Sequence, residues 1–152
     1  MFSKFSESAR KILVSAKKEM SLLSHPYIGT EHLLLAILKN PNSNITKKLS
    51  TYKLNYQNFK EQLIEIIGYG KDKNEYFLYT PLVKKIVEQA IMDSRENNDG
   101  EVTAEHIFIS MLEEGEGVAI RIMLSMNVNL EEVHNYFLNK FKTKKTKKIK
   151  NC

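Results

Sequence analysis

The sequence predicts an all-α protein in which two tandem four-helix repeats pack as one pseudo-twofold domain. Apolar residues recur at intervals of three and four, the period of a helix with one buried face, and no segment alternates with the period of two that strands show. The phrase GTEHLLLAIL at positions 29–38 returns as TAEHIFISML at positions 103–112, so the Glu-His pair is repeated. Because a helix cannot bury its apolar face alone, we expect the eight helices to share one core.

One constant offset, which carries Glu31 to Glu105, relates the two halves of the chain without a gap. This repeat offset pairs Phe5 with Tyr79, Ser6 with Thr80, Ile12 with Ile86, Ala16 with Ala90, His32 with His106 and Asn55 with Asn129. A constant offset over about 60 positions indicates a duplication. We therefore predict a domain over residues 1–139, with repeat one at about 5–68 and repeat two at about 79–141.

The first helix of each repeat follows a hydroxyl residue that can cap it. Ser6 and Thr80 are good N-cap residues, because their side-chain oxygen can accept a backbone N–H that the helix leaves unpaired. Pro81 follows Thr80, at the position where proline's missing N–H costs nothing. The apolar stripe of the first helix in repeat one consists of Ala9, Ile12, Leu13, Ala16, Met20 and Leu23.

The second helix of each repeat begins at the Glu-His phrase. Gly and Thr are acceptable N-caps and Ala is a poor one, so Gly29 and Thr103 are the expected caps. This choice places Glu31 and Glu105 in the first turn of their helices.

The third and fourth helices are predicted from their breaks and caps. The third helix is expected over residues 45–52 and again over 118–126. Asn55 and Asn129 can cap the fourth helix, and Gly68 can end the fourth helix of repeat one.

Positive charge is concentrated near the end of the chain. The net charge is +5 and the isoelectric point is about 9.2. Seven lysines between positions 140 and 150 contribute +7, which leaves about −2 for residues 1–139. The folded part is therefore mildly acidic, and residues 140–152 are predicted to be a Lys-rich linker or tail.

The composition predicts a cytoplasmic protein without a membrane partner. Hydrophobic residues make up 42% and charged residues 27% of the chain, as in soluble globular proteins. No apolar run approaches the roughly 20 residues that span a bilayer, and the start of the chain lacks the apolar stretch of a secretory signal. Cys152 is the only cysteine, which excludes a disulfide or a cysteine-based metal site within the chain.

The sequence lacks the motifs of common enzymes, so we expect no catalysis, metal or cofactor. The segment GYGKDK lacks the spacing and the final hydroxyl of a P-loop, and there is no His-Glu-x-x-His zinc motif. A carboxylate pair made of Glu31 and Glu105 would need a cleft and a tuned pKa to act in catalysis. Scattered histidines beside apolar runs are interpreted as packed, hydrogen-bonded residues: His25, His32, His106 and His134.

Four phrases carry a resemblance to a known family: FSESARKIL, YIGTEHLLLAIL, YTPLVKKIVEQA and EEGEGVAIRIM. At these spacings they resemble the Clp N-terminal domain, the double Clp R repeat module, and most of all that of ClpC-type AAA+ unfoldases. The resemblance covers about residues 5–138 and implies a non-catalytic docking domain for adaptor proteins and protein substrates. It also implies ATPase rings outside this chain, which feed a ClpP-type peptidase. ATP is expected to bind in those rings and not in this domain.

The resemblance further implies sites for phosphoarginine on target proteins, one in each repeat. The family's Glu in the Thr-Glu-His phrase matches Glu31 and Glu105, and its hydroxyl at the start of the first helix matches Ser6 and Thr80. A carboxylate accepts hydrogen bonds from a guanidinium group, and a helix N-terminus with a cap hydroxyl suits a phosphate. The alternative is that the four residues are ordinary caps and first-turn acids, which the helix dipole favours by about 0.3–1 kcal/mol.

Two other functions stay open from the sequence. The chain could be a free-standing Clp R adaptor or decoy, or it could bind nucleic acid through its Lys-rich tail, although the mildly acidic folded part makes nucleic acid the weaker alternative. The repeats also differ from each other. Repeat two has Thr103-Ala104 where the family prefers Gly-Thr, and NPNSNITKK in repeat one corresponds to EGEGVAIR in repeat two.

Overall fold

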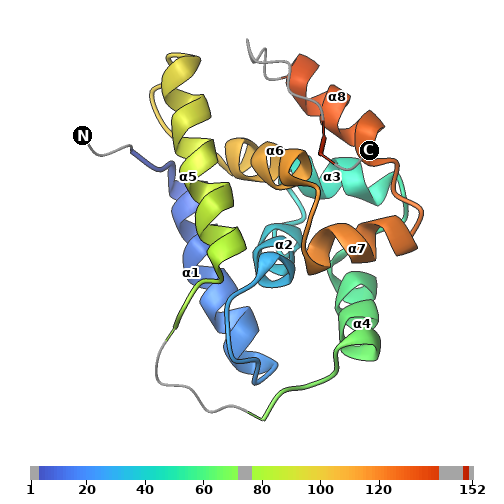
Figure 1. The fold of residues 1–152 in the computed structure, drawn as a ribbon. Helices are drawn as coiled ribbons and strands as arrows, with labels where there is room; N and C mark the ends of the chain where they lie inside the picture. The colour runs from blue at the N-terminus through green and yellow to red at the C-terminus, as the bar shows by residue number, and fades with distance from the viewer. Residues whose placement is uncertain (1–3, 72–76, 141–148, 151–152) are drawn as a thin grey trace.

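In a computed structural model, the described residues are 4–71, 77–140 and 149–150, and they form eight helices and no strand (Figure 1). This confirms the predicted all-α fold. The helices are α1 (Glu7–Leu22), α2 (Thr30–Leu38), α3 (Asn44–Ser50), α4 (Tyr56–Ile66), α5 (Pro81–Glu96), α6 (Ala104–Glu114), α7 (Val118–Ser125) and α8 (Leu130–Lys140).

The caps predicted for the first and fourth helices of each repeat are confirmed. The side-chain oxygens of Ser6 and Thr80 accept the backbone N–H three residues further on, at 3.1 and 3.2 Å. Asn55 and Asn129 cap α4 and α8 in the same way, at 2.9 and 3.0 Å. Gly68 follows α4 with a positive φ of 81°, a conformation that glycine adopts without strain.

The third helices differ from their predicted bounds by one or two residues. Helix α3 begins one residue earlier than predicted, because Ser43 Oγ accepts the N–H of Thr46 at 3.1 Å and so caps it. It ends at Ser50 because the chain then turns through Lys53, whose φ is 62°. Helix α7 ends one residue before the predicted bound, at Ser125.

Two isolated β-bridges join the repeats and exchange their partners. Phe5 pairs with Val102, and Ile28 pairs with Tyr79. The repeat offset converts one pair into the other with the repeats swapped, so the two repeats are related by a pseudo-twofold. The hydrogen bonds form two matching sets: Ser6 N–H to Val102 O (2.9 Å) and Val102 N–H to Lys4 O (2.7 Å), and Thr80 N–H to Ile28 O (3.0 Å) and Ile28 N–H to Leu78 O (2.9 Å).

Helices α2 and α6 lie in the middle of the molecule (Figure 1). Helix α2 packs against α1, α3, α4 and α7, whereas α6 packs against α5, α8 and α1. All residues of α2 are buried except Glu31, and all of α6 except Glu105 and His106; these three are half-buried. The two glutamates therefore mark the places where the central helices reach the surface.

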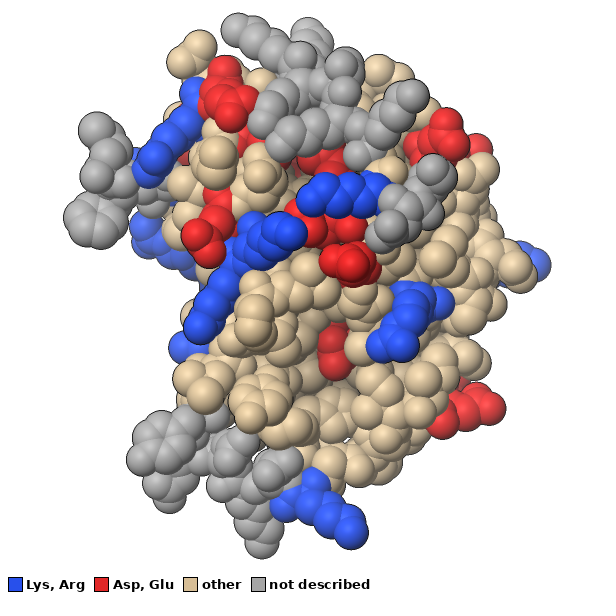
Figure 2. Space-filling view, in the orientation of Figure 1, with Lys and Arg blue, Asp and Glu red and all other residues tan. Residues whose placement is uncertain are grey.

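The last described residues pack against the end of α6. Ile149 is buried, and the N–H of Lys150 donates to Glu113 O at 2.9 Å. The Nζ of Lys150 lies 3.3 Å from a carboxylate oxygen of the buried Glu114. Residues 141–148 and 151–152 of the predicted Lys-rich tail lie outside the described residues. On the face in Figure 2, cations and carboxylates are interspersed.

Candidate functional site

A cavity of about 430 Å³ lies where three helices from both repeats begin. Its lining includes Glu31 in the first turn of α2, Thr80 at the N-cap of α5, and Gly117 at the N-cap of α7. Leu82 and Val118 complete this part of the wall, and we call the cavity with these five residues the first site. The first N–H groups of a helix have no partner within it and carry its positive dipole end, so the first site is electropositive apart from Glu31.

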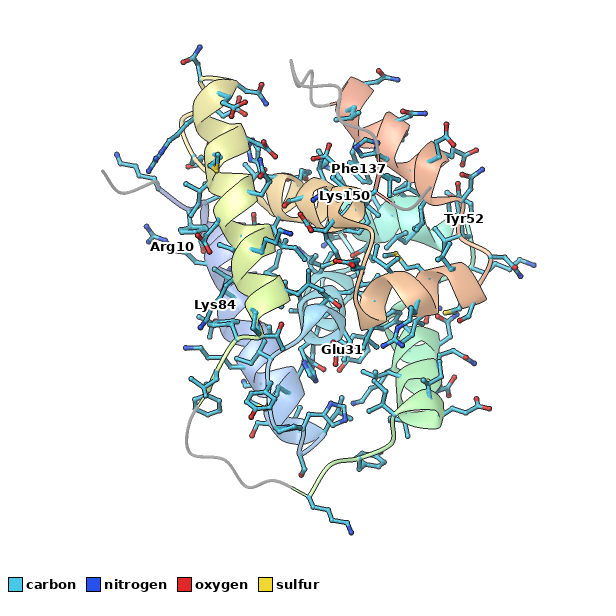
Figure 3. The ribbon with its side chains drawn as sticks, viewed as in Figure 1. Arg10, Glu31, Tyr52, Lys84, Phe137 and Lys150 are labelled. Carbon is cyan, nitrogen blue, oxygen red and sulfur yellow. The ribbon has the colours of Figure 1, made fainter. Side chains whose placement is uncertain are left out.

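The Glu31 side chain reaches into the first site near the centre of the molecule (Figure 3). Burial raises the pKa of Glu31, while its own backbone N–H and the nearby His25 and Arg121 act in the opposite direction. The side chain is half-buried and so remains open to solvent. A carboxylate held in this way can accept hydrogen bonds from a cationic ligand.

The carboxylate of Glu31 folds back over Gly29, into the space that a Cβ atom at position 29 would occupy. The φ of Gly29 is −102°, which any residue can adopt, so the carboxylate rather than the backbone requires glycine here. Thr103 takes the equivalent position in repeat two. Glu105 accepts a hydrogen bond from Asn44 Nδ2 at 3.4 Å instead, so the two carboxylates are held differently.

The hydroxyl of Thr30 links the two repeats beneath the first site. Its Oγ1 accepts the N–H of Ala119 in the first turn of α7, at 3.1 Å. A Cβ atom at Gly117 would come within 2.7 Å of this hydroxyl, so Thr30 and Gly117 fit only together. The positions that match these two hold Ala104 and Ser43, and there Ser43 caps its own helix. Ala104 therefore lacks the hydroxyl that makes this link in repeat one.

Glu105 lies at the equivalent place, where α6 and α1 begin, and we call the region around it the second site. With Ser8, Ser43 and Asn44, Glu105 lines a groove of about 730 Å³. Ser6, the N-cap of α1, does not line the groove; it is buried, and its Oγ lies 3.1 Å from the Oγ of Ser8, which does. The second site consists of these five residues.

The structure brings the predicted site residues together across the repeats. Glu31 of repeat one shares its cavity with Thr80 of repeat two, whereas Glu105 of repeat two lies beside the start of α1, which Ser6 of repeat one caps. Each site is therefore built from both repeats. Glu31 and Glu105 line different cavities, which gives no support to a catalytic carboxylate pair.

The histidine of the first Glu-His phrase completes the cap of α2. The N–H of Gly29 donates to His32 Nδ1 at 2.9 Å, which leaves the proton of the neutral ring on Nε2. That nitrogen donates to His25 Nδ1 at 2.8 Å, and His25 Nε2 donates to Gly68 O at 2.8 Å. Burial, and then His25, lowers the pKa of His32 from 6.5 to about 3, so the His32 ring is neutral.

The second Glu-His phrase uses the same cap with a different partner. The N–H of Thr103 donates to His106 Nδ1 at 2.9 Å, and His106 Nε2 lies 2.7 Å from Asp99. His134 Nε2 lies 2.9 Å from Glu113. All four histidines are thus hydrogen-bonded, and the prediction that they are packed, hydrogen-bonded residues is confirmed.

His25, Glu31 and His32 approach one another closely enough to suggest a metal site, because their ligand atoms lie within 4.8 Å of one another. The hydrogen bonds argue against that use. In each ring one nitrogen already donates a hydrogen bond and the other already accepts one. Neither ring therefore has an unused lone pair for a metal. The donor set therefore does not fit a resident metal ion.

The contribution of α7 to the first site was not predicted from the sequence. Gly117 and Val118 form a wall of the cavity beside Glu31, although they belong to the other repeat. The glycine directly before the apolar run of α7 was the available signal, because glycine is an acceptable N-cap where a side chain would clash.

The fold and its paired sites define the class of protein: an all-α double-repeat domain with a candidate site at each place where the repeats cross. The sequence model of the Clp repeat (R) N-terminal domain family matches residues 4–90 and 78–150. The chain belongs to this family. No helix of the described residues is long and apolar enough to cross a membrane.

The chain is similar to curated proteins that are much longer than itself. It is 33% identical over 130 residues to the ATP-dependent Clp protease ATP-binding subunit ClpC of Staphylococcus saprophyticus, covering 86% of this chain and 16% of that protein. It is also 33% identical over 138 residues to the negative regulator of genetic competence ClpC/MecB of Bacillus subtilis, covering 91% and 17%. The chain thus spans about one sixth of these relatives.

Solved structures share the fold at low sequence identity. The N-terminal domain of ClpD from Arabidopsis thaliana superposes with a TM-score of 0.73 at 19% identity, covering 91% of this chain and 95% of that one. A ClpV N-domain in complex with a VipB peptide superposes with a TM-score of 0.67 at 22% identity, covering 90% and 85%. These likenesses support the fold.

Proposed function

We propose that this chain is the docking domain of a ClpC-type ATP-dependent unfoldase, which binds adaptor proteins and protein substrates and recognises phosphoarginine on tagged proteins. The observation that carries the proposal is the first site, where a half-buried carboxylate lies beside three helix N-termini. Phosphoarginine carries an anionic phosphate next to a guanidinium-derived group with N–H donors. The two kinds of group in the site match the two ends of this ligand.

The phosphate end is matched by the starts of α5 and α7. Pro81 has no N–H and Val83 N–H bonds to Thr80 Oγ1, so Leu82 N–H is the group of that turn without an acceptor inside the helix. The Thr80 hydroxyl accepts one bond and still has its own hydrogen to donate to a phosphate oxygen. A phosphate gains both from these donors and from the helix dipoles.

The N–H end of the ligand is matched by Glu31. Burial already raises the pKa of this carboxylate, because it lies in a cavity with largely apolar walls. A cationic or N–H-rich ligand restores the interactions that the carboxylate has lost with water. In the second site, the half-buried Glu105 beside the start of α1 can accept hydrogen bonds from the same end of the ligand.

The relatives support the wider part of the proposal. The similar ClpC proteins are named as ATP-binding subunits of an ATP-dependent protease, and a structural neighbour binds a peptide. In such an assembly this chain serves as a non-catalytic module, and ATP and a ClpP-type peptidase act elsewhere. A free-standing adaptor or decoy would use the same two sites, so the site chemistry can be tested in the chain itself.

Titration with free phosphoarginine tests the proposal, with residue-resolved NMR to locate the site. We expect binding at both sites of the chain, loss of one site in each of Glu31→Ala and Glu105→Ala, and no binding in the double variant, whose helical circular dichroism and cooperative melting stay intact. Arginine and phosphoserine serve as ligand controls, and Glu65→Ala, an exposed glutamate of α4, is the matched protein control. Unchanged affinity in the double variant would mean that both glutamates are merely first-turn acids.

A further inference from the structure

The repeat offset allows the walls of the two sites to be compared position by position within one molecule. Leu82 and Val118 of the first site correspond to Ser8 and Asn44 of the second. Tyr27, which also lines the first cavity, corresponds to Glu101. At all three positions, an apolar or aromatic residue of the first site is replaced by a polar or acidic residue.

The rim of the first site is apolar and exposed. Tyr27, Ile67 and Tyr69 line the cavity, with 54%, 44% and 65% of their surface accessible to solvent. Among the described residues that line this cavity, Glu31 is the only Asp, Glu, Lys or Arg. An exposed apolar rim around a charged floor is typical of a binding site rather than of ordinary surface.

The surroundings of Glu105 are charged instead. Lys11 and Lys39 line the groove on one side of Glu105. Asp99 and Glu101 line a hollow of about 270 Å³ on the other side, and both are exposed. Three carboxylates close together favour a cation on an incoming segment and disfavour a large apolar side chain. The second site therefore offers carboxylates to the residue next to the modified arginine, whereas the first site offers it an apolar rim.

We propose that the two sites select different neighbours of the modified residue. The first site takes phosphoarginine that adjoins a large aromatic or aliphatic residue, and the second takes phosphoarginine that adjoins a lysine or arginine. This inference rests on the proposed function, because the phosphoarginine fixes the segment on the floor and the rim then contacts the next side chain. Burial of that side chain against Tyr27 and Tyr69 supplies the preference.

Single-site variants and three peptides test the inference. Glu105→Ala leaves only the first site and Glu31→Ala only the second. Each peptide carries one phosphoarginine, flanked by phenylalanine, by lysine or by glycine. We expect Glu105→Ala to bind the phenylalanine peptide about tenfold more tightly than the glycine peptide, and Glu31→Ala to prefer the lysine peptide.

Exposed rim residues provide a second variant that avoids disturbing the core. Adding Tyr27→Ala and Tyr69→Ala to Glu105→Ala should reduce the affinity ratio of the phenylalanine and glycine peptides to about one. Adding Met92→Ala, which removes an exposed apolar residue of α5 outside both sites, should leave the ratio near ten. Equal affinities of all three peptides for each single-site variant, with free phosphoarginine still bound, would overturn this inference alone. No binding of free phosphoarginine would overturn the proposed function as well.

Discussion

The carboxylate of Glu31 lies over Gly29, in the space that a side chain at position 29 would fill. The absence of a side chain at Gly29 thereby allows the carboxylate to fold back into the first site. In repeat two, Thr103 occupies the position of Gly29, and Glu105 bonds to Asn44 instead.

Replacing Gly29 by alanine should displace the carboxylate without straining the backbone. We expect Gly29→Ala to weaken phosphoarginine binding at the first site about tenfold, because the Glu31 carboxylate loses its position. The melting temperature should change little, since Gly29 has an ordinary φ and Thr103 occupies the matching position. Titration in the Glu105→Ala background isolates the first site.

Gly100→Ala is the control for that experiment, because a Cβ atom there meets nothing within 4 Å. It should leave the first site's affinity unchanged. If Gly29→Ala binds as tightly as the parent, the folded-back carboxylate plays no part in binding.

Thr30→Ala should destabilise the domain, because it removes the acceptor for the buried N–H of Ala119. An N–H left without a partner in the interior costs about 1–2 kcal/mol in the free energy of unfolding. Urea denaturation measures this loss. Thr51→Ala, which removes an exposed hydroxyl in a turn, should cost much less, and equal losses in both variants would contradict the role assigned to Thr30.

The neutral ring of His32 predicts a stability that falls in acid. The pKa of His32 is about 3 in the folded chain and 6.5 when the residue is unperturbed. Between these values the unfolded chain binds a proton that the folded chain does not, so stability is full above about pH 6.5 and is lost as the pH falls toward 3. The contribution of this one group is at most about 1.4 kcal/mol per pH unit.

His32→Asn tests this pH dependence. The asparagine oxygen can still accept the Gly29 N–H, but the side chain does not titrate. The free energy of unfolding, measured by urea between pH 7 and pH 4, should fall less steeply in the variant than in the parent. Parallel curves would show that His32 does not carry the acid sensitivity.

Tyr56→Phe should expose the cost of a buried carboxylate. The Tyr56 hydroxyl donates to Glu19 at 2.6 Å, and only 1% of Glu19 is exposed. Burial, followed by the hydrogen bond and the charge of Glu19, raises the pKa of Tyr56. Removing the hydroxyl takes a strong donor from this carboxylate and should cost about 1.5–3 kcal/mol of unfolding free energy. Tyr69→Phe, at an exposed tyrosine, is the matched control and should cost almost nothing.

The sequence predicted the fold because most of the helices carry their own start signal. Ser6, Thr80, Asn55 and Asn129 cap the helices that they were predicted to cap, and the repeat offset predicted the symmetry. Local rules work here because a cap bonds to a residue only three positions away.

The composition of the sites was harder to predict, because an offset does not say which repeat supplies each wall. The offset relates the same equivalent residues whether each site is built within one repeat or from both repeats. Contacts between the repeats, such as the bridge of Phe5 with Val102, reveal the exchange. The burial of Ile149 was likewise beyond local rules, since a lysine-rich run predicts solvent.

The exchanged bridges have a consequence for the history of the chain. A single repeat contains both kinds of bridge residue, Phe5 and Ile28. In this fold, however, each of them pairs with a residue of the other repeat. Two separate copies could satisfy each other in the same crossed arrangement, as a homodimer with identical sites. Residues 4–71 expressed alone should therefore sediment as a dimer, the form from which fusion of two genes would have allowed each site to diverge.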